Sequence, residues 1–281
     1  MTATIAETLK SAVQRLGSRS ESPRLDAELL MGKVTGLSRA ALIMHGDESV
    51  SRDMAQSFAD LVARRLTGMP VAYLTGSSEF WSLPLTVTPA VLIPRPETET
   101  LVEQVLQLKA RDEHCAVLDL GTGSGAIALS LSVERPHWNI TGIDVSEDAL
   151  KIAAMNSQAL GLTRIQWRLG SWFDCVVGAR FDLIVANPPY IAASDPALDK
   201  LAAEPALALI AGPSGLEALS TIIAQAPAHL RAGGWLLLEH GSTQAQDVAA
   251  LLEQRGFEAI RTVQDFAGRP RITLGSVHTH H

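Results

Sequence analysis

A buried strand runs directly into a glycine turn in Ala116-Val117-Leu118-Asp119-Leu120-Gly121-Thr122-Gly123-Ser124-Gly125. The first five residues form a short apolar run around one aspartate, which is typical of a strand inside a parallel sheet. The glycines that follow permit a tight turn and a close approach of the backbone to a ligand. An apolar helix is expected next, from Ala126 to Val133. A strand, a glycine turn and a helix in this order predict the start of an α/β fold.

Beyond this turn the chain continues to alternate strands with helices, and this alternation specifies a parallel sheet. Further elements are expected as strands at 140–144, 165–168, 181–186 and 234–239 and as helices at 147–160, 216–230 and 244–254. Two closing strands, at 257–264 and 271–274, have no helix between them and should therefore be antiparallel. The predicted fold class is α/β, with a mostly parallel sheet and an antiparallel last strand.

The chain before residue 99 has a different character. Short amphipathic helices are expected up to about residue 70, with Ser22, Ser38 and Ser51 as N-caps. Strands at 71–74, 78–81 and 85–87 are then expected to form a β-hairpin linker. We therefore divide the chain into a helical bundle at 1–70, a hairpin linker at 71–98 and an α/β domain at 99–281. The bundle is expected to recognise a partner or to pack on the main domain.

Composition and charge narrow the class of protein. The chain has 281 residues, 47% of them hydrophobic, and a formal net charge of -7. An acidic chain is a poor non-specific binder of nucleic acid, so no stable complex with nucleic acid is expected. The sequence lacks a secretory signal and an apolar stretch long enough to span a bilayer, which predicts a cytoplasmic protein with no membrane partner. Cys115 and Cys175 are far apart and have no ligand-spaced partners, so no metal site is expected, and a monomer is the default.

The glycine turn and Asp144 together predict a pocket for an adenosine-containing cofactor. Asp144 ends the second strand about 20 residues after the turn, the distance at which an acid accepts hydrogen bonds from ribose hydroxyls. The alternative role for Asp144 is that of N-cap for the helix at 147–160. The turn is Gly-x-Gly-x-Gly, unlike the dinucleotide pattern, and neither a second mononucleotide half nor a Walker-type Gly-Lys-Ser/Thr is present. S-adenosylmethionine, which needs one nucleoside pocket, fits this pattern best.

A second motif, Asn187-Pro188-Pro189-Tyr190, stands where the strand at 181–186 is expected to end. Asn187 offers an amide oxygen and an NH2 group, and Tyr190 offers a flat ring with a polar tip. A residue that precedes proline is held in extended geometry, so Asn187 should project beyond the sheet edge. Such a corner could grip a planar group that carries NH2. The alternative is a proline-rich turn that only caps the strand.

Two prolines flank an arginine in Ile93-Pro94-Arg95-Pro96-Glu97-Thr98-Glu99, and a helix is expected to begin near Thr98. The prolines should hold Arg95 in extended geometry, so Arg95 and Glu97 could be presented rigidly to a ligand. The alternative is a surface salt bridge near the start of the helix, where the helix dipole favours acidic side chains.

The motifs at 93–99, 117–125 and 187–190, together with Asp144, resemble those of the HemK/PrmC family. The resemblance extends over nearly the whole chain and includes Leu238-Glu239-His240-Gly241. It implies a Rossmann-like, S-adenosylmethionine-dependent methyltransferase sheet behind a helical substrate-recognition domain. It also implies the reaction, which is transfer of a methyl group to the side-chain amide nitrogen, N5, of the glutamine in the Gly-Gly-Gln motif of peptide-chain release factors.

The resemblance also implies roles for single residues. The cofactor would be bound by Gly121, Thr122, Gly123, Ser124, Gly125, Asp144, Trp172 and Asn187. The substrate would be bound by Arg95, Glu97, Asn187, Pro188, Pro189 and Tyr190, of which Asn187, Pro188 and Tyr190 would be catalytic. In this scheme the Asn187 side-chain oxygen and the Pro188 carbonyl accept hydrogen bonds from the glutamine NH2, and Tyr190 packs on the flat amide.

Other functions remain open at this stage. A ribosomal-protein glutamine methyltransferase would look similar. Adenine-N6 methylation of nucleic acid would use the same corner, because adenine also carries NH2 on a planar carbon, although the net charge argues against it. A third alternative is a nucleoside-binding module that binds the cofactor without turnover.

Overall fold

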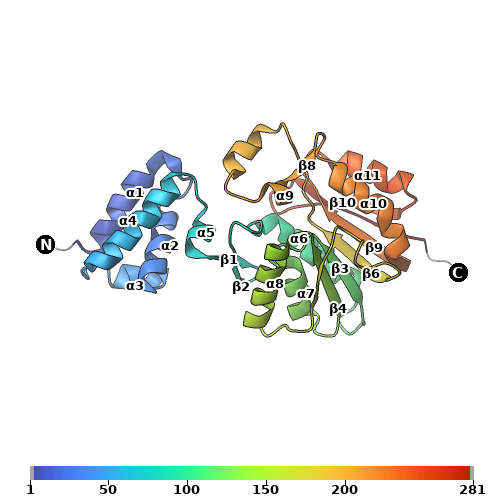
Figure 1. The fold of residues 1–281 in the computed structure, drawn as a ribbon, viewed down its shortest axis with the longest axis horizontal. Coiled ribbons are helices and arrows are strands. Elements are labelled where there is room, and N and C mark those ends of the chain that lie inside the picture. Colours follow the sequence, from blue (N-terminus) through green and yellow to red (C-terminus); the bar gives the residue numbers. More distant parts are fainter. Residues whose placement is uncertain (1–2, 279–281) are drawn as a thin grey trace. The chain divides into compact units, whose positions relative to one another are not determined.

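The computed structural model describes residues 3–278 and divides the chain between Ser77 and Ser78 into two units, Met1–Ser77 and Ser78–His281 (Figure 1). The first unit is helical and contains α1 (Ile5–Leu16), η1 (Gly17–Arg19), α2 (Pro23–Thr35), α3 (Arg39–Met44), α4 (Arg52–Leu66) and α5 (Val71–Thr75). Its own core consists of buried apolar side chains that include Ile5, Leu16, Leu30, Met31, Phe58 and Val62.

Serine hydroxyls cap two of these helices, as the sequence predicts. Ser38 accepts from the backbone N–H of Ala41, and Ser51 accepts from that of Met54. Ser22 stands before α2, with proline at the first helical position, but its side chain accepts no capping hydrogen bond. Local sequence therefore places the helix starts correctly even where the capping bond is not formed.

The strand expected at 71–74 is wrong, because these residues form the short helix α5. The backbone N–H groups of Tyr73 and Leu74 both donate to the Pro70 carbonyl at 3.2 Å. Gly76, in the left-handed region at φ 78°, ends the helix. Leu74 is buried in the helical core, so packing decides the conformation of an apolar run whose β-propensity is only a weak preference. The hairpin is confined to β1 (Ser77–Phe80) and β2 (Leu83–Thr86).

The second unit is built on a seven-stranded sheet in the order β10-β11-β9-β6-β3-β4-β5. Its strands are β3 (Ala116–Leu120), β4 (Asn139–Asp144), β5 (Gln166–Leu169), β6 (Phe181–Ala186), β9 (Leu230–Glu239), β10 (Glu258–Gln264) and β11 (Pro270–Ser276). The pairs among β3, β4, β5, β6 and β9 are parallel, whereas β11 is antiparallel to both β9 and β10. The predicted α/β class and the antiparallel closing strands are confirmed.

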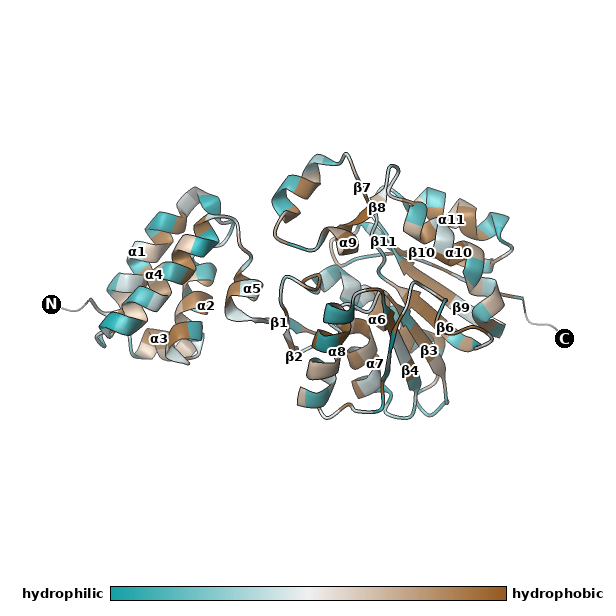
Figure 2. Cartoon of the chain, viewed as in Figure 1, coloured by the Kyte–Doolittle hydropathy of each residue, from teal (hydrophilic) through white to brown (hydrophobic). Residues whose placement is uncertain are grey.

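Helices cover both faces of this sheet (Figure 1). The longer helices are α6 (Pro96–Leu108), α7 (Ala126–Glu134), α8 (Glu147–Ala159), α10 (Glu217–His229) and α11 (Ala245–Gln254). Alternate residues of the central strands contribute to two cores, one shared with α6 and α7 and the other shared with α10 and α11. The strands are accordingly mostly brown in Figure 2, while α8 and α11 carry teal as well as brown. Short elements fill the segment before α10, namely β7 (Ile191–Ala192), η2 (Pro196–Leu201), α9 (Ala206–Leu209) and β8 (Ile210–Gly212).

The register of the central strands sets the position of the loops that follow them. Leu120 of β3 lies opposite Ile143 of β4 on one side and opposite Ala186 of β6 on the other. The three strands therefore end at the same level, and the glycine turn, Asp144 and Asn187 all begin at one edge of the sheet.

Gly142 gives a test of how tightly this edge is packed. A Cβ atom at this position would lie 2.4 Å from Cζ3 of Trp167 and 3.0 Å from Oγ1 of Thr122. Overpacking of a core typically costs about 1–3 kcal/mol, and we expect Gly142→Ala to lower the free energy of unfolding in urea by about this amount. The same change made together with Trp167→Leu should cost less, because the indole is gone. Equal costs in the two backgrounds would contradict this packing.

Candidate active site

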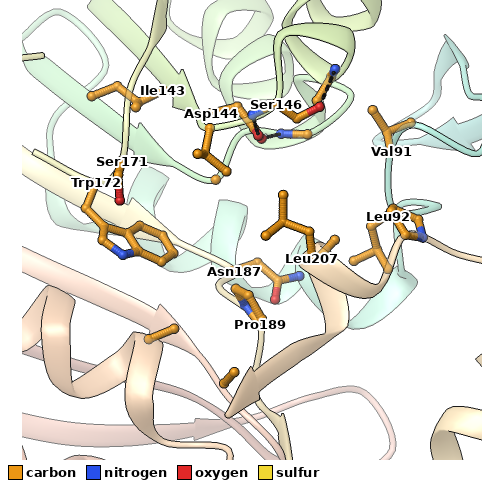
Figure 3. Close-up of a pocket in the computed structure, with 18 of the residues that line it drawn as sticks. Val91, Leu92, Ile143, Asp144, Ser146, Ser171, Trp172, Asn187, Pro189 and Leu207 are labelled. Carbon is orange, nitrogen blue, oxygen red and sulfur yellow. Dashed lines mark hydrogen bonds between the residues drawn. The ribbon is translucent and has the colours of Figure 1, made fainter. Parts of the chain in front are cut away.

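A cavity of about 430 Å³ opens at the carboxyl edge of β3, β4 and β6 (Figure 3). Its lining includes Val91, Leu92, Gly121, Gly123, Ile143, Asp144, Trp172, Asn187, Pro189 and Leu207. Ligands of open α/β sheets bind beyond the carboxyl ends of the strands, and a cavity of this volume can hold a small organic cofactor. The structure thus brings the two sequence motifs, the glycine turn and the Asn-Pro-Pro-Tyr corner, to one cavity.

The glycine turn presents bare backbone to this cavity. Gly121, Gly123 and Gly125 all lie in the left-handed region, at φ 70°, 56° and 85°, where glycine alone carries no steric penalty. Gly121 and Gly123 line the cavity. Gly125 serves packing, because a Cβ atom there would lie 3.1 Å from side-chain atoms of both Leu129 and Trp167. The first two glycines therefore permit close approach of a ligand, and the third permits close packing beneath it.

The carboxylate of Asp144 is fixed at the cavity wall by two backbone groups. Its Oδ2 accepts from the N–H of Gly123 at 2.8 Å and its Oδ1 accepts from the N–H of Ser146 at 2.9 Å. Each carboxylate oxygen can accept a further hydrogen bond. The N-cap of α8 is Ser146, whose hydroxyl accepts from the N–H of Ala149, so the N-cap alternative for Asp144 is wrong. Burial raises the pKa of the Asp144 carboxyl above its usual value.

Trp172 reaches the cavity from a strained turn after β5. Its φ of 49° is uncommon for a bulky residue, and such strain tends to occur at ligand sites. The indole faces the cavity from the side opposite Val91 and Leu92 (Figure 3). A flat aromatic face at this place offers a stacking surface to a planar ligand.

Two residues of the turn lie beneath the cavity surface and are not among those that line it. Thr122 is buried and its hydroxyl donates to Oδ2 of Asp119 at 2.5 Å. Ser124 is also buried, and its backbone carbonyl accepts from Nδ2 of Asn156 at 2.9 Å. Asp119, which the sequence analysis treats only as a strand residue, supports the turn from below. Burial raises the pKa of its carboxyl to about 7.

At the Asn-Pro-Pro-Tyr corner, Asn187 lines two adjoining cavities, as do Leu92 and Ala208. Asn187 and Pro189 line the large cavity, and Asn187 and Tyr190 line a second cavity of about 240 Å³. Pro188 is buried and lines neither. Burial, followed by the nearby Glu239 carboxyl, raises the pKa of Tyr190 to about 12, so this phenol stays protonated at neutral pH. Asn187 is the polar side chain among the residues that the two linings share.

The Asn187 side chain is held from behind. Its Nδ2 donates to Oγ1 of Thr98 at 3.1 Å, and the Thr98 hydroxyl donates to Oε2 of Glu239 at 2.7 Å. Thr98 is in the first turn of α6 and Glu239 ends β9. Both residues lie within the sequence motifs at 93–99 and 238–241, but local sequence indicates a role for neither. A carboxylate at the end of a strand in this apolar sheet was the signal that could have identified Glu239.

Arg95 and Glu97 lie differently with respect to the two cavities. Arg95 lines the small cavity and forms an ion pair with Glu204, whose other oxygen accepts from the N–H of Ile93 at 3.2 Å. Glu204 is buried, so this pair is not the surface salt bridge considered as the alternative. Glu97 is half-buried and lines neither cavity. The negative charge of Glu97 contributes to the raised pKa of Glu239.

Within residues 3–278, no helix is long and apolar enough to cross a bilayer. In the same part of the chain, no group of three or more His, Cys, Asp or Glu side chains is arranged to hold a metal ion.

Comparisons with known proteins converge on one family. The family described as "PrmC N-terminal domain" matches residues 7–76, and the one described as "Methyltransferase domain" matches residues 111–264. A "Release factor glutamine methyltransferase" of Xylella fastidiosa (strain Temecula1) is 50% identical, over 90% of this chain and 92% of that protein. The protein of the same name from Escherichia coli (strain K12) is 43% identical, over 95% of this chain and 96% of that protein. The chain belongs to the release factor glutamine methyltransferase family.

Solved structures share the fold of this family member. A methyltransferase from Pyrococcus furiosus has a TM-score of 0.56 at 18% identity, over 79% of this chain and 100% of that chain. A T. thermophilus 16S rRNA N2 G1207 methyltransferase, in complex with AdoMet and guanosine, has a TM-score of 0.55 at 20% identity, over 72% of this chain and 50% of that chain. At these identities the likeness shows the fold alone.

Asp119 gives a test of the buried charge beneath the glycine turn. Its pKa in the folded protein is about 7, whereas an unfolded aspartate titrates near about 3.9. Between these values the folded state holds more protons, so this carboxyl lowers the free energy of unfolding as pH rises from about 4 to about 7. Asp119→Asn removes that dependence. We expect the variant to gain stability relative to the original chain between pH 5 and pH 8 in urea titrations. A difference that is constant with pH would contradict the buried, protonatable carboxyl.

Proposed function

We propose that this family member uses S-adenosylmethionine to methylate N5 of the glutamine in the Gly-Gly-Gln motif of a peptide-chain release factor. The observation that carries the proposal is the position of Asn187, which borders both a cofactor-sized cavity and a small second cavity. Family membership supports the release factor as the substrate, because relatives at 43–50% identity carry that name. Methylation of a ribosomal protein or of adenine has no comparable support.

The large cavity suits S-adenosylmethionine. Gly121 and Gly123 leave room for the amino-acid end of the cofactor, where side chains would collide with it. Asp144 retains acceptor capacity for the ribose hydroxyls, and Trp172 offers its indole to the adenine. Thr122, Ser124 and Gly125 would contribute by shaping the backbone of the turn. The chemistry that the cofactor would supply is an electrophilic methyl group on a sulfonium, with S-adenosylhomocysteine as the leaving group and product.

The small cavity suits the side-chain amide of the substrate. The Asn187 side-chain oxygen would accept one hydrogen bond from the glutamine NH2, the Pro188 carbonyl would accept another, and Tyr190 would pack on the amide plane. An amide nitrogen is a poor nucleophile because its lone pair is delocalised. Two fixed acceptors would aim the lone pair and stabilise the positive charge that develops on nitrogen.

Magnitudes favour positioning over base catalysis at this corner. Fixing two reactants in near-attack geometry can lower a barrier by about 7–11 kcal/mol, whereas a general base typically contributes ~10²–10⁴-fold. The Tyr190 phenol has a pKa of about 12 and is therefore protonated at neutral pH. A protonated phenol cannot accept the amide proton as a general base. We therefore expect the substrate amide to lose its proton during or after methyl transfer.

The remaining residues would support the substrate site less directly. Arg95, held by Glu204, would form one wall of the small cavity, with Glu97 and Pro189 nearby. Of the predicted division into a substrate-recognition bundle at 1–70, a linker at 71–98 and a methyltransferase domain at 99–281, we move only the first boundary, because α5 belongs to the helical unit that ends at Ser77. The cytoplasmic location and the monomeric state stay predictions of the sequence analysis.

One assay separates the candidate substrates. Radiolabelled S-adenosylmethionine is offered in parallel to a release factor, its Gly-Gly-Ala variant, ribosomal proteins and DNA. We expect label in the release factor alone and none in the Gly-Gly-Ala variant. Label only in ribosomal protein or DNA would overturn the assignment, and cofactor binding without any label would indicate a binding module.

Asn187→Ala tests the acceptor at the junction of the cavities. We expect the rate of methyl transfer to fall by ~10²-fold or more, the usual cost of removing one preorganised hydrogen-bonding group. Cofactor affinity should stay within a few-fold, because Asp144 and the glycine turn are untouched. Single-turnover kinetics and calorimetry measure the two effects. Turnover close to that of the original chain would refute the role of Asn187.

Asp144→Ala tests the ribose acceptor. Hydrogen bonds to a charged group contribute about 1.5–3 kcal/mol each, so losing one or more should weaken S-adenosylmethionine binding by about 10-fold or more. Calorimetry measures the affinity, and the melting temperature shows whether losing the bonds to Gly123 and Ser146 also destabilises the fold. Unchanged affinity would mean that Asp144 only organises the turn.

A further inference from the structure

A line of three polar side chains runs from the active site into the interior of the sheet domain. Asn187 lies at the cavity wall, Thr98 is 4% exposed and Glu239 is 1% exposed. The two hydrogen bonds that join them, at 3.1 Å and 2.7 Å, connect a loop, a helix and a strand. The sequence separations are 89 residues from Thr98 to Asn187 and 141 residues from Thr98 to Glu239. Nothing in the proposed chemistry so far uses Thr98 or Glu239.

The direction of these hydrogen bonds follows from the number of protons available. An ionised carboxylate can only accept hydrogen bonds. The Thr98 hydroxyl therefore donates its single proton in a hydrogen bond to Glu239. The Thr98 oxygen then has no proton left for Asn187 and can act only as an acceptor towards it. Of the two ends of the Asn187 amide, only the NH2 group can donate to this oxygen. The side-chain oxygen of Asn187 must therefore point away from Thr98.

We infer that Thr98, backed by Glu239, fixes which end of the Asn187 amide faces the substrate. Thr98 and Glu239 are positioning residues, since they act through Asn187 and touch no reacting atom. The inference rests on the proposed function, in which the Asn187 oxygen accepts a hydrogen bond from the NH2 group of a substrate amide. The fixed orientation would make the site specific for a group that carries NH2. An inverted Asn187 would instead present its own NH2 group to the NH2 group of the substrate, and the two could not form the required hydrogen bond.

An asparagine needs such a support because the two ends of its amide have nearly the same shape. Packing alone therefore discriminates poorly between the two orientations, and the partners of the amide decide between them. Leaving a buried polar group unpaired is unfavourable enough to bias the orientation by about five-fold or more. The Thr98 hydroxyl, whose proton is already donated to Glu239, favours one orientation of the Asn187 amide. It does so without placing a charge beside the substrate.

The surroundings of Glu239 act on its ionisation in opposite directions. Burial is the largest influence and raises the pKa to about 7, while Thr98, Arg271 and Arg95 favour the ionised form and Glu97 opposes it. The ionised form, on which the direction of these hydrogen bonds depends, therefore predominates above about pH 7. Arg271 also donates from Nη1 to the carbonyl of His240, the residue that follows Glu239.

Kinetics with three threonine variants test the inference. Thr98→Val keeps the shape of the side chain but removes the hydroxyl, Thr98→Ser keeps the hydroxyl, and Thr100→Val is the matched control. Thr100 is on the same helix and equally buried, at 4% exposed, and its hydroxyl has no hydrogen-bond partner among the described residues.

With saturating S-adenosylmethionine and release factor, we expect Thr98→Val to lower kcat by about 10-fold or more, because the acceptor is no longer preorganised. The Kd for the cofactor should stay within about 3-fold, since an asparagine orientation does not alter the glycine turn or Asp144. Thr98→Ser and Thr100→Val should both keep kcat within about 3-fold of the original chain. An unchanged kcat in Thr98→Val, or an equal loss in Thr98→Ser, would overturn the inference.

An NMR measurement on the original chain tests the orientation without any substrate or variant. The side-chain NH2 protons of Asn187 should show a nuclear Overhauser effect to Thr98. Absence of this effect, with the NH2 protons assigned, would overturn the inference whatever the substrate is. If the effect is present but the protein labels no release factor, the orientation stands and the proposed function fails.

Discussion

The pairing of β3 with both β4 and β6 is the constraint on which the active site depends. Because Leu120 lies opposite Ile143 and Ala186, three loops leave the sheet at one level. Neighbouring strands are about 4.8 Å apart, so the groups that follow them lie within reach of one ligand. A register slip of one residue would turn every side chain of the slipped strand to the other face. The cavity is therefore a consequence of strand pairing, and the loops add only the chemistry.

Three buried carboxyls then hold separate loops at that edge. Asp119 accepts from Thr122 below the glycine turn, and Glu239 accepts from Thr98 behind Asn187. Glu204 pairs with Arg95 beside the small cavity. Burying a carboxyl is unfavourable unless hydrogen bonds or charges compensate, and each of these three carboxyls has such a partner on the segment that it holds. These three buried carboxyls therefore support the segments around the two cavities.

Much of the fold could be predicted from sequence because its signals are local. The apolar strand runs, the glycine turn and the helix caps each occupy a few neighbouring residues, and the predicted α/β sheet is confirmed. The prediction failed at 71–74, where burial in the helical unit converts an apolar run into α5. Local pattern could not reveal that tertiary preference.

The site was only partly predictable, for a related reason. Asp144 and Asn187 were predicted as site residues because they stand at the ends of expected strands. The roles of Thr98 and Glu239 depend instead on a hydrogen bond between residues that are 141 positions apart in the sequence. The pairing of Arg95 with Glu204 likewise spans 109 residues. The corner itself does not distinguish a glutamine amide from an adenine amine, since both carry NH2 on a planar carbon. Resemblance to a family, and then the comparisons, made that distinction.

The central claim is that the corner at Asn187 aims the nitrogen of a glutamine side chain at a methyl donor. Fragmentation mass spectrometry of a release factor, incubated with the protein and S-adenosylmethionine, tests this claim most directly because it locates the added methyl group. The account predicts one methyl group on the side-chain amide nitrogen of the glutamine in Gly-Gly-Gln. A methyl group on any other atom of the release factor, or an unmodified glutamine after full turnover of the cofactor, would contradict it.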